Sequence, residues 1–341
     1  MANLISIDWL TLYGEYEPTK AEYVPHYLKG SSKKGGQVFA LSEPILYYGK
    51  QCAVIAHTPM SRILPANAGQ LTFSNWVLYD VDFLRYIRDV CLFIGFRPTS
   101  ISRIDVAVDF QCFSCGLAPK DFINGFFKGK YVKNGGGNFA SYGKCGESLE
   151  INTLAFGKRS SGVFARLYNK SVEQVEQVSK PWVKAMWKAV GMDETKDVWR
   201  LEFELRGRAV KIANMGTGEF GGIAFDCLLS RDYLCDLLSM LYRDYFDFRI
   251  FSAQANKSRW KRLNMFNFQM SDLTRVRAFN MSRGGLREKI LIKNLHKFSE
   301  RYGYKDLLNA NIGRELADDL AKNTGLTKWY YTKMEEWKGE E

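Results

Sequence analysis

Apolar and polar residues alternate along several short segments, and this period of two predicts β-strands with one apolar face. The predicted strands are residues 5–13, 102–110, 151–156, 162–170 and 199–206. In the segment 102–110, for example, Ile104, Val106 and Val108 fall on one face and the charged residues fall on the other. The apolar faces are expected to pack against the core.

Other segments show helical spacing of apolar residues. The clearest set is Phe83, Leu84, Ile87, Val90, Cys91 and Ile94. Asp80 is expected to cap this helix, and Gly95 and Pro98 are expected to end it. The remaining predicted helices are a short one from Pro119, one over 171–190 with a break near Pro181, and a long one over 226–246. Because no regular βαβ period is present, we predict an α+β fold with a largely antiparallel central β-sheet flanked by helices.

Charge is concentrated late in the chain. The net charge is +11, and the segment 249–305 carries 14 Lys and Arg against three Asp and Glu, which equals the whole excess. Aromatic residues are interleaved with these cations, a composition suited to nucleic acid. We therefore predict two regions, a catalytic region over 1–248 and a basic, mainly helical DNA-binding region over 249–341. The first region could consist of two sheet-forming halves, of about 1–100 and 101–248. The candidate DNA-binding residues of the second region are Lys257, Arg259, Lys261, Arg262, Arg275, Arg277, Arg283 and Arg287.

Composition excludes several other classes of protein. Hydrophobic residues make up 46% of the 341 residues, which argues against a disordered chain. The first residues lack the pattern of a signal peptide, and no apolar run is long enough to span a membrane. The seven cysteines form a single Cys-x-x-Cys pair, Cys112 and Cys115, without a partner pair for zinc. We expect a cytoplasmic protein with no membrane partner.

Two predicted strands carry carboxylates on their polar faces. Arg103, Asp105 and Asp109 share one face of the first strand, with the small Ala107 between the two carboxylates. The second strand repeats the pattern with Arg200, Glu202, Glu204 and Arg206. Carboxylate oxygens suit Mg²⁺ or Mn²⁺, although either strand alone could be a solvated face whose charges pair with each other.

A third predicted strand places Tyr168 between Arg166 and Lys170 on one face. Positive neighbours favour the phenolate form of a tyrosine and can hold a phosphate. If the three strands are neighbours, the carboxylates and the tyrosine converge on one side of the sheet. That set suits metal-assisted transesterification at phosphorus, in which the tyrosine becomes linked to a 5′-phosphate.

Four segments together resemble the replication initiation factor family, the Rep_trans group of rolling-circle initiators and related relaxases. They are ISIDWL at residues 5–10, SRIDVAVDF at 102–110, TLAFGKRSSGVFARLYNK at 153–170 and WRLEFEL at 199–205. The resemblance covers roughly residues 5–210 and does not extend to the last third of the chain.

The resemblance implies a nicking-closing enzyme with a relaxase-like sheet. It implies Tyr168 as the nucleophile and acidic residues as ligands of Mg²⁺ or Mn²⁺. Asp105 and Glu202 match the most recurrent positions, and Asp109 and Glu204 share their faces. Arg103 and Arg200 are expected to contact DNA. The implied partners are origin DNA, as duplex and as exposed single strand, and a second copy of the chain.

Missing motifs narrow the interpretation. The three histidines do not form the His-hydrophobic-His pair of many rolling-circle enzymes, which leaves a carboxylate-based site. No P-loop is present, so unwinding would require a host helicase. The pattern GTGEFG at 216–221 lacks a preceding strand, which argues against dinucleotide binding.

Three alternatives stay open: a relaxase of a conjugative or integrative element, a metal-dependent nuclease without a covalent intermediate, and a non-catalytic origin-binding regulator.

Overall fold

The computed structural model describes residues 3–135, 137–145, 149–176, 179–206, 228 and 231–268. The chain divides into two compact units, 1–271 and 272–341, and every described residue belongs to the first. The candidate residues Arg275, Arg277, Arg283 and Arg287 and the pattern at 216–221 lie outside the described residues.

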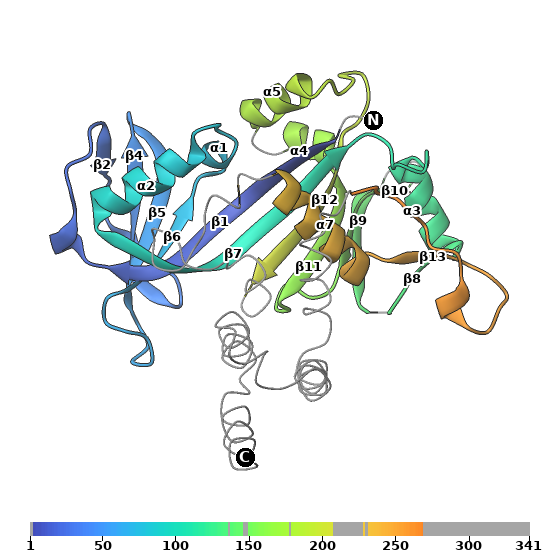
Figure 1. Ribbon diagram of the computed structural model, residues 1–341, viewed down its shortest axis with the longest axis horizontal. Helices are drawn as coiled ribbons and strands as arrows, with labels where there is room; N and C mark the ends of the chain where they lie inside the picture. The colour runs from blue at the N-terminus through green and yellow to red at the C-terminus, as the bar shows by residue number, and fades with distance from the viewer. Residues whose placement is uncertain are drawn as a thin grey trace, which may run out of the picture. The chain divides into compact units, whose positions relative to one another are not determined.

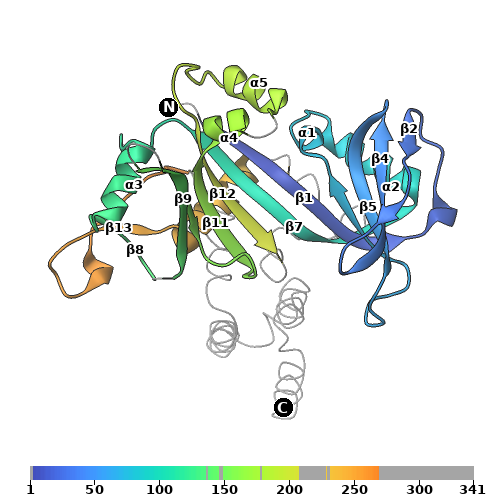
Figure 2. The ribbon, with the colours of Figure 1, turned by 180° about the vertical axis from the view of Figure 1, so that it is seen from behind.

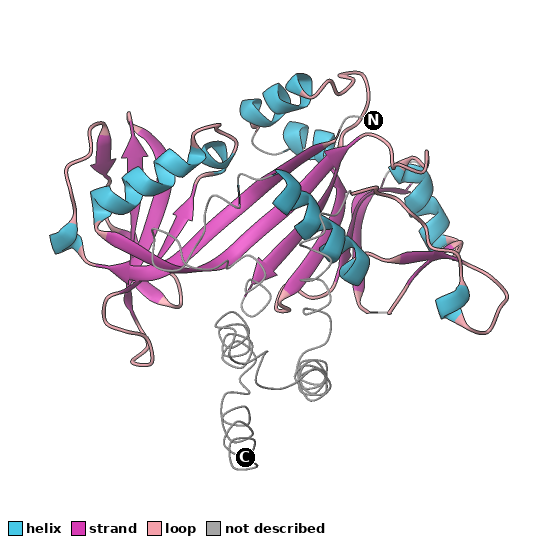
Figure 3. Ribbon diagram, viewed as in Figure 1, coloured by secondary structure: helices cyan, strands magenta, loops and turns pink. Residues whose placement is uncertain are grey.

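One antiparallel sheet of 11 strands dominates the described part of the first unit (Figure 3). In spatial order its strands are β2 (Tyr27–Lys29), β4 (Phe39–Tyr47), β5 (Lys50–Pro59), β6 (Ala68–Phe73), β1 (Leu4–Tyr16), β7 (Phe96–Phe110), β12 (Trp199–Arg206), β11 (Val163–Asn169), β10 (Leu149–Phe156) and β9 (Phe139–Cys145), with β3 (Lys33–Lys34) beside β4. A separate pair joins β8 (Tyr131–Lys133) to β13 (Phe248–Ile250). The described α-helices are α1 (Asn75–Leu78), α2 (Phe83–Ile94), α3 (Pro119–Phe127), α4 (Lys170–Glu176), α5 (Pro181–Ala189) and α7 (Arg231–Tyr245), and η1 (Pro18–Lys20) and η3 (Lys257–Arg259) are short 3-10 helices. The α+β class with an antiparallel sheet flanked by helices is confirmed.

The long strands β1 and β7 make the sheet continuous (Figures 1 and 2). They span 13 and 15 residues and pair over most of their length, with the N-terminal strands on one side and β12 to β9 on the other. The two halves suggested at about 1–100 and 101–248 are therefore parts of a single sheet, because β7 crosses that boundary.

The main core lies on the apolar face of the sheet. Ile104, Val106 and Val108 of β7 are fully buried there, and Leu238 and Leu241 of α7 belong to the same cluster. A smaller cluster lies on the opposite face, under α5. It consists of Leu4, Val183, Trp187, Met192 and Val198. Both faces of the sheet are therefore covered at the end where α5 packs.

The core continues past the boundary predicted at residue 248. β13 pairs with β8, and Leu263, Met265 and Phe266 are buried in the main cluster. Tyr242 of α7 donates its hydroxyl hydrogen to the carbonyl of Leu263 at 2.9 Å. The start of the basic region is thus part of the first unit, because its apolar residues complete the core.

Several local predictions are confirmed with small corrections. Helix α2 ends at Gly95, whose φ of 67° is left-handed and where a Cβ would lie 2.2 Å from the carbonyl oxygen of Glu17. Its N-cap is Asp82 rather than Asp80, and the Asp80 carboxylate accepts a hydrogen bond from the Asp82 amide instead. The break at Pro181 separates α4 from α5 because proline has no amide hydrogen to continue the helix.

Candidate active site

The sheet order brings the three predicted strands side by side as β7, β12 and β11. Directly opposed residues of antiparallel strands project to the same face. On this face, each row holds one residue from β7, one from β12 and one from β11, in that order. The first row is Asp105, Glu204 and Phe164, and the second is Ala107, Glu202 and Arg166. The third row is Asp109, Arg200 and Tyr168. The convergence expected from the sequence is therefore present.

Tyr168 lies between a carboxylate and a cation. Its hydroxyl donates to Glu202 Oε2 at 3.0 Å and accepts from Lys170 Nζ at 3.2 Å. Arg166 donates to the other oxygen of Glu202. Lys170 is the first residue of α4 and is also paired with Glu173, one turn along that helix. The tyrosine hydroxyl thus has both a hydrogen-bond acceptor and a cation in contact with it.

The protonation of Tyr168 differs from the sequence-based expectation. Burial and the negative charge of Glu202 raise the pKa of Tyr168 well above its ordinary value, whereas flanking cations were expected to favour the phenolate. Burial and the neighbouring Arg200 lower the pKa of Lys170. Tyr168 is only 8% exposed, so desolvation outweighs the attraction of the cations. Deprotonation of this tyrosine requires a base, and Glu202 is the carboxylate in contact with it.

Arg200 is the centre of a buried network. It is fully buried and contacts Asp109 through Nε at 2.5 Å and through Nη2 at 2.8 Å. It also pairs with Asp8 and donates to the hydroxyl of Tyr79 at 2.8 Å. The indole of Trp187 donates to Asp109 Oδ2 at 2.7 Å. These contacts correct two predictions: Arg200 is an internal counter-ion rather than a DNA contact, and both oxygens of Asp109 are already engaged.

Asp8 is a member of the site that the sequence analysis did not single out. It lies at a bulge of β1, between Ile7 and Trp9, and accepts a hydrogen bond from Tyr79 at 2.9 Å. Burial alone would raise the pKa of Asp8, but Arg200 and Lys170 hold it far below its ordinary range. The sequence could have indicated Asp8 as a site residue, because it is the one charged residue in the ISIDWL segment.

Asp105 and Glu204 are directly opposed on the same face of the sheet, and Arg103 donates hydrogen bonds to both. The guanidinium donates to Asp105 at 2.8 and 2.6 Å and to Glu204 at 3.1 Å. Burial, with repulsion from Glu202 and Glu204, outweighs Arg103 and raises the pKa of Asp105 to about 7. Arg103 is therefore paired with both carboxylates, and its contact with DNA stays a prediction.

The predicted set of four metal ligands is only partly brought together. Among the residues the structure describes, no group of three or more His, Cys, Asp or Glu side chains is arranged to hold a metal ion. Asp109 is committed to Arg200 and Trp187, and Glu202 to Tyr168 and Arg166. Asp105 and Glu204 are directly opposed, and both are paired with Arg103, Glu204 also with Arg206. Mg²⁺ is often bound by one or two carboxylates completed by substrate phosphate and water, and here the ion would replace these arginine contacts. This pair fits such an ion in donor chemistry.

The described part of the basic region presents three of its predicted DNA-binding cations to solvent. Lys257, Arg259 and Lys261 are exposed. Arg262 is different, because its guanidinium lies 2.8 Å from Asp247 and packs over the ring of Tyr242. Arg262 is therefore paired within the first unit, and its contact with DNA stays a prediction.

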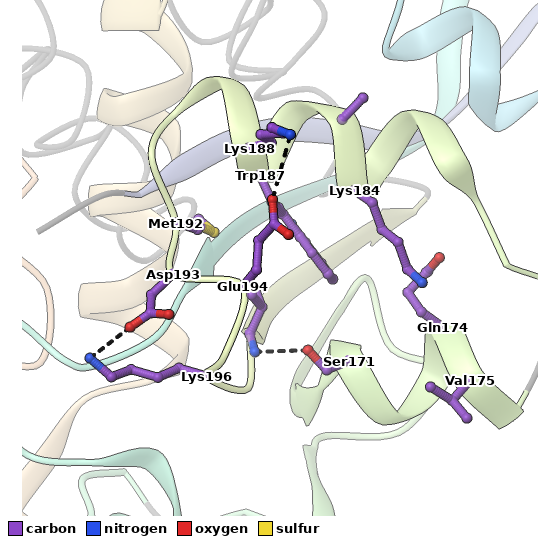
Figure 4. A pocket seen from close by; sticks show the side chains of 12 residues that line it. Ser171, Gln174, Val175, Lys184, Trp187, Lys188, Met192, Asp193, Glu194 and Lys196 are labelled. Carbon is purple, nitrogen blue, oxygen red and sulfur yellow. Dashed lines mark hydrogen bonds and ion pairs between the residues drawn. The ribbon is translucent and has the colours of Figure 1, made fainter.

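A pocket of about 440 Å³ lies between α4, α5 and the loop that precedes β12 (Figure 4). Trp187 and Met192 contribute apolar surface to it. Two of its lysines lie beside acidic residues, Lys196 3.0 Å from Asp193 and Lys188 3.9 Å from Glu194, and Lys184 also lines it. Because charges of both signs line the pocket, it indicates no single class of ligand.

Comparison with solved structures gives a similarity in fold. The chain resembles a rolling circle replication initiator protein from Geobacillus stearothermophilus, with 16% sequence identity and a TM-score of 0.47, over 77% of this chain and 93% of that chain. No family model and no curated protein matches the sequence. Within the described residues, no helix combines the length and the apolar character needed to cross a membrane.

Proposed function

We propose that this chain is a DNA-nicking initiator of rolling-circle replication and that Tyr168 is its nucleophile. The observation that carries the proposal is the position of the Tyr168 hydroxyl, 3.0 Å from Glu202 and 3.2 Å from Lys170. The motif resemblance at residues 5–10, 102–110, 153–170 and 199–205 supports the same function.

In the proposed step, Glu202 accepts the phenolic proton while the Tyr168 oxygen bonds to phosphorus. The bond between phosphorus and the 3′-oxygen breaks, and that oxygen takes up a proton and leaves as a free 3′-hydroxyl. The 5′-phosphate stays on Tyr168. Arg166 and Lys170 stabilise the negative charge that develops on the phosphate and the phenolic oxygen. The reverse reaction rejoins the strand.

Mg²⁺ or Mn²⁺ is part of the proposal, with Asp105 and Glu204 as the residues that would hold it. When bound, such an ion neutralises charge on the phosphate oxygens. Glu202 and Asp109 are not metal ligands in this proposal. Glu202 is the base for Tyr168, and Asp109 is the counter-ion of Arg200.

The test is formation of a protein–DNA adduct. Single-stranded oligonucleotides tiling the genetic element that encodes the chain are incubated with protein and Mn²⁺, and adducts are mapped by peptide mass. We expect an adduct at Tyr168, and Tyr168→Phe should reduce cleavage by at least about 10³-fold with binding retained. Glu202→Gln, which removes the proposed base, should slow cleavage without weakening binding.

Tyr79→Phe is a matched control, because Tyr79 is a partly buried tyrosine of the same network whose hydroxyl contacts Asp8 and Arg200 rather than Glu202. It should still form the adduct at Tyr168. Cleavage without an adduct would instead favour a water-activating nuclease, and binding without cleavage on every oligonucleotide would favour a non-catalytic regulator.

A further inference from the structure

Trp9 is an exposed aromatic residue on the face that carries the site. It is 39% exposed, and no other tryptophan among the described residues is as accessible. Its indole belongs to neither hydrophobic cluster. Instead, the Arg103 guanidinium lies over its ring, 4.4 Å from the ring centroid. Core packing therefore does not account for this side chain.

The position of Trp9 continues a row of site residues. Trp9 is opposite Asp105 across β1 and β7, and Asp105 is opposite Glu204 across β7 and β12. Arg103, which packs on the ring of Trp9, also donates hydrogen bonds to Asp105 and Glu204. Trp9 thus forms the edge of the charged face on the β1 side.

The ring is held in place before any ligand binds. Its Nε1 donates to Thr11 Oγ1 at 2.8 Å, and the guanidinium on the ring is itself fixed by Asp105. An aromatic surface that is already ordered loses little conformational entropy when a partner stacks on it.

We propose that Trp9 stacks on an unpaired base of the DNA strand whose phosphate is attacked by Tyr168; this rests on the proposed function. The side chains of Arg166 and Arg206 are 30% and 47% exposed on the same face, where they are paired with Glu202 and Glu204, so these two carboxylates present less uncompensated negative charge to a DNA strand. β1 and β11 are three strand spacings apart, about 14 Å, so the stacked base lies away from the scissile phosphate along the strand. Base–aromatic stacking is largely independent of base identity.

The experiment measures binding of fluorescent oligothymidylate and of an abasic oligomer of equal length, in chelator, so that cleavage does not interfere. We expect Trp9→Ala to weaken binding of oligothymidylate roughly tenfold, or about 1.4 kcal/mol, and to leave the abasic oligomer unaffected. Trp9→Phe should retain most of the affinity, whereas Trp9→Leu, which keeps apolar volume without a ring, should not. Tyr23→Ala removes an 89% exposed aromatic residue elsewhere and should change neither affinity.

An equal loss for both oligomers, or no loss for either, would overturn the role of Trp9. The adduct assay separates this inference from the proposed function. An adduct at Tyr168 with no base-dependent effect of Trp9 would refute stacking alone. Base-dependent binding through Trp9 in a protein that forms no adduct would refute the nicking activity and leave a single-strand binding surface.

Discussion

Each carboxylate on the charged face has a cation in contact with it. Removing two opposite charges from water is unfavourable unless the geometry and the remaining hydrogen bonds are good. Arg200 satisfies Asp8 and Asp109 in this way. Asp105 is less well compensated, because it shares Arg103 with Glu204 and also lies near Glu202.

The raised pKa of Asp105 gives a prediction for stability. The folded-state pKa is about 7 against an ordinary value of 3.8, so the folded protein binds this proton more tightly than the unfolded chain does. The resulting stabilisation is complete below the unfolded pKa and is lost as pH rises through the folded pKa. Asp105→Asn carries no such charge and should lose less stability between about pH 5 and about pH 8, by about 1 kcal/mol or more, since one pKa unit corresponds to ~1.36 kcal/mol.

Denaturant unfolding in chelator at several pH values measures this difference. Glu150→Gln is a suitable control, because Glu150 is an exposed carboxylate whose pKa is lowered by Lys120. Parallel pH profiles for wild type and Asp105→Asn would show that Asp105 is already ionised at low pH.

Among the secondary-structure elements, helix α5 stabilises the hydrogen-bond network around Arg200, the residue opposite Tyr168. Its two tryptophans each donate an indole hydrogen toward that network, Trp187 to Asp109 at 2.7 Å and Trp182 to Asn75 Oδ1 at 2.8 Å. Asn75 in turn donates to Asp8 Oδ1 at 3.1 Å. A short amphipathic helix thereby fixes the two carboxylates that flank Arg200.

Trp187→Phe should lower the free energy of unfolding by about 1–3 kcal/mol, because it removes a donor from a buried carboxylate as well as ring volume. Trp182→Phe should have a smaller effect, since that side chain is only half-buried. The two variants are compared by denaturant unfolding at neutral pH. Equal effects would mean that the bond to Asp109 contributes no more than packing does.

For the whole molecule, the separation of charge along the sequence predicts how duplex DNA is bound. Arg275, Arg277, Arg283 and Arg287 belong to the second unit, 272–341, by sequence position. Changing all four to Gln should weaken duplex binding and flatten its dependence on salt, by up to ~0.9 in the log–log slope for each phosphate that is no longer neutralised.

The control changes four exposed cations of the first unit, Lys20, Arg85, Arg97 and Lys120, to Gln. Both variants lose the same charge, so a general effect of net charge would alter their salt slopes equally. A slope that falls only in the first variant would place the phosphate-binding cations in the second unit.

The sequence by itself determined the local pattern of this protein. It determined the apolar and charged faces of 102–110 and 199–206, the helix ended by Gly95, and the shared face of Arg166, Tyr168 and Lys170. These follow from backbone periodicity and from the conformations of glycine and proline, which act over a few residues. The residues of the charged face on these three segments could therefore be predicted.

Only the tertiary structure decided which charges meet and which are buried. It joined Asp8, Tyr79 and Trp187 to the site from segments far apart in sequence, made Arg200 an internal counter-ion, and extended the core beyond residue 248. It also reversed the expected pKa shift of Tyr168. The physical reason is that desolvation and ion pairing depend on everything packed around a group, whereas neighbours along a strand supply only part of its surroundings.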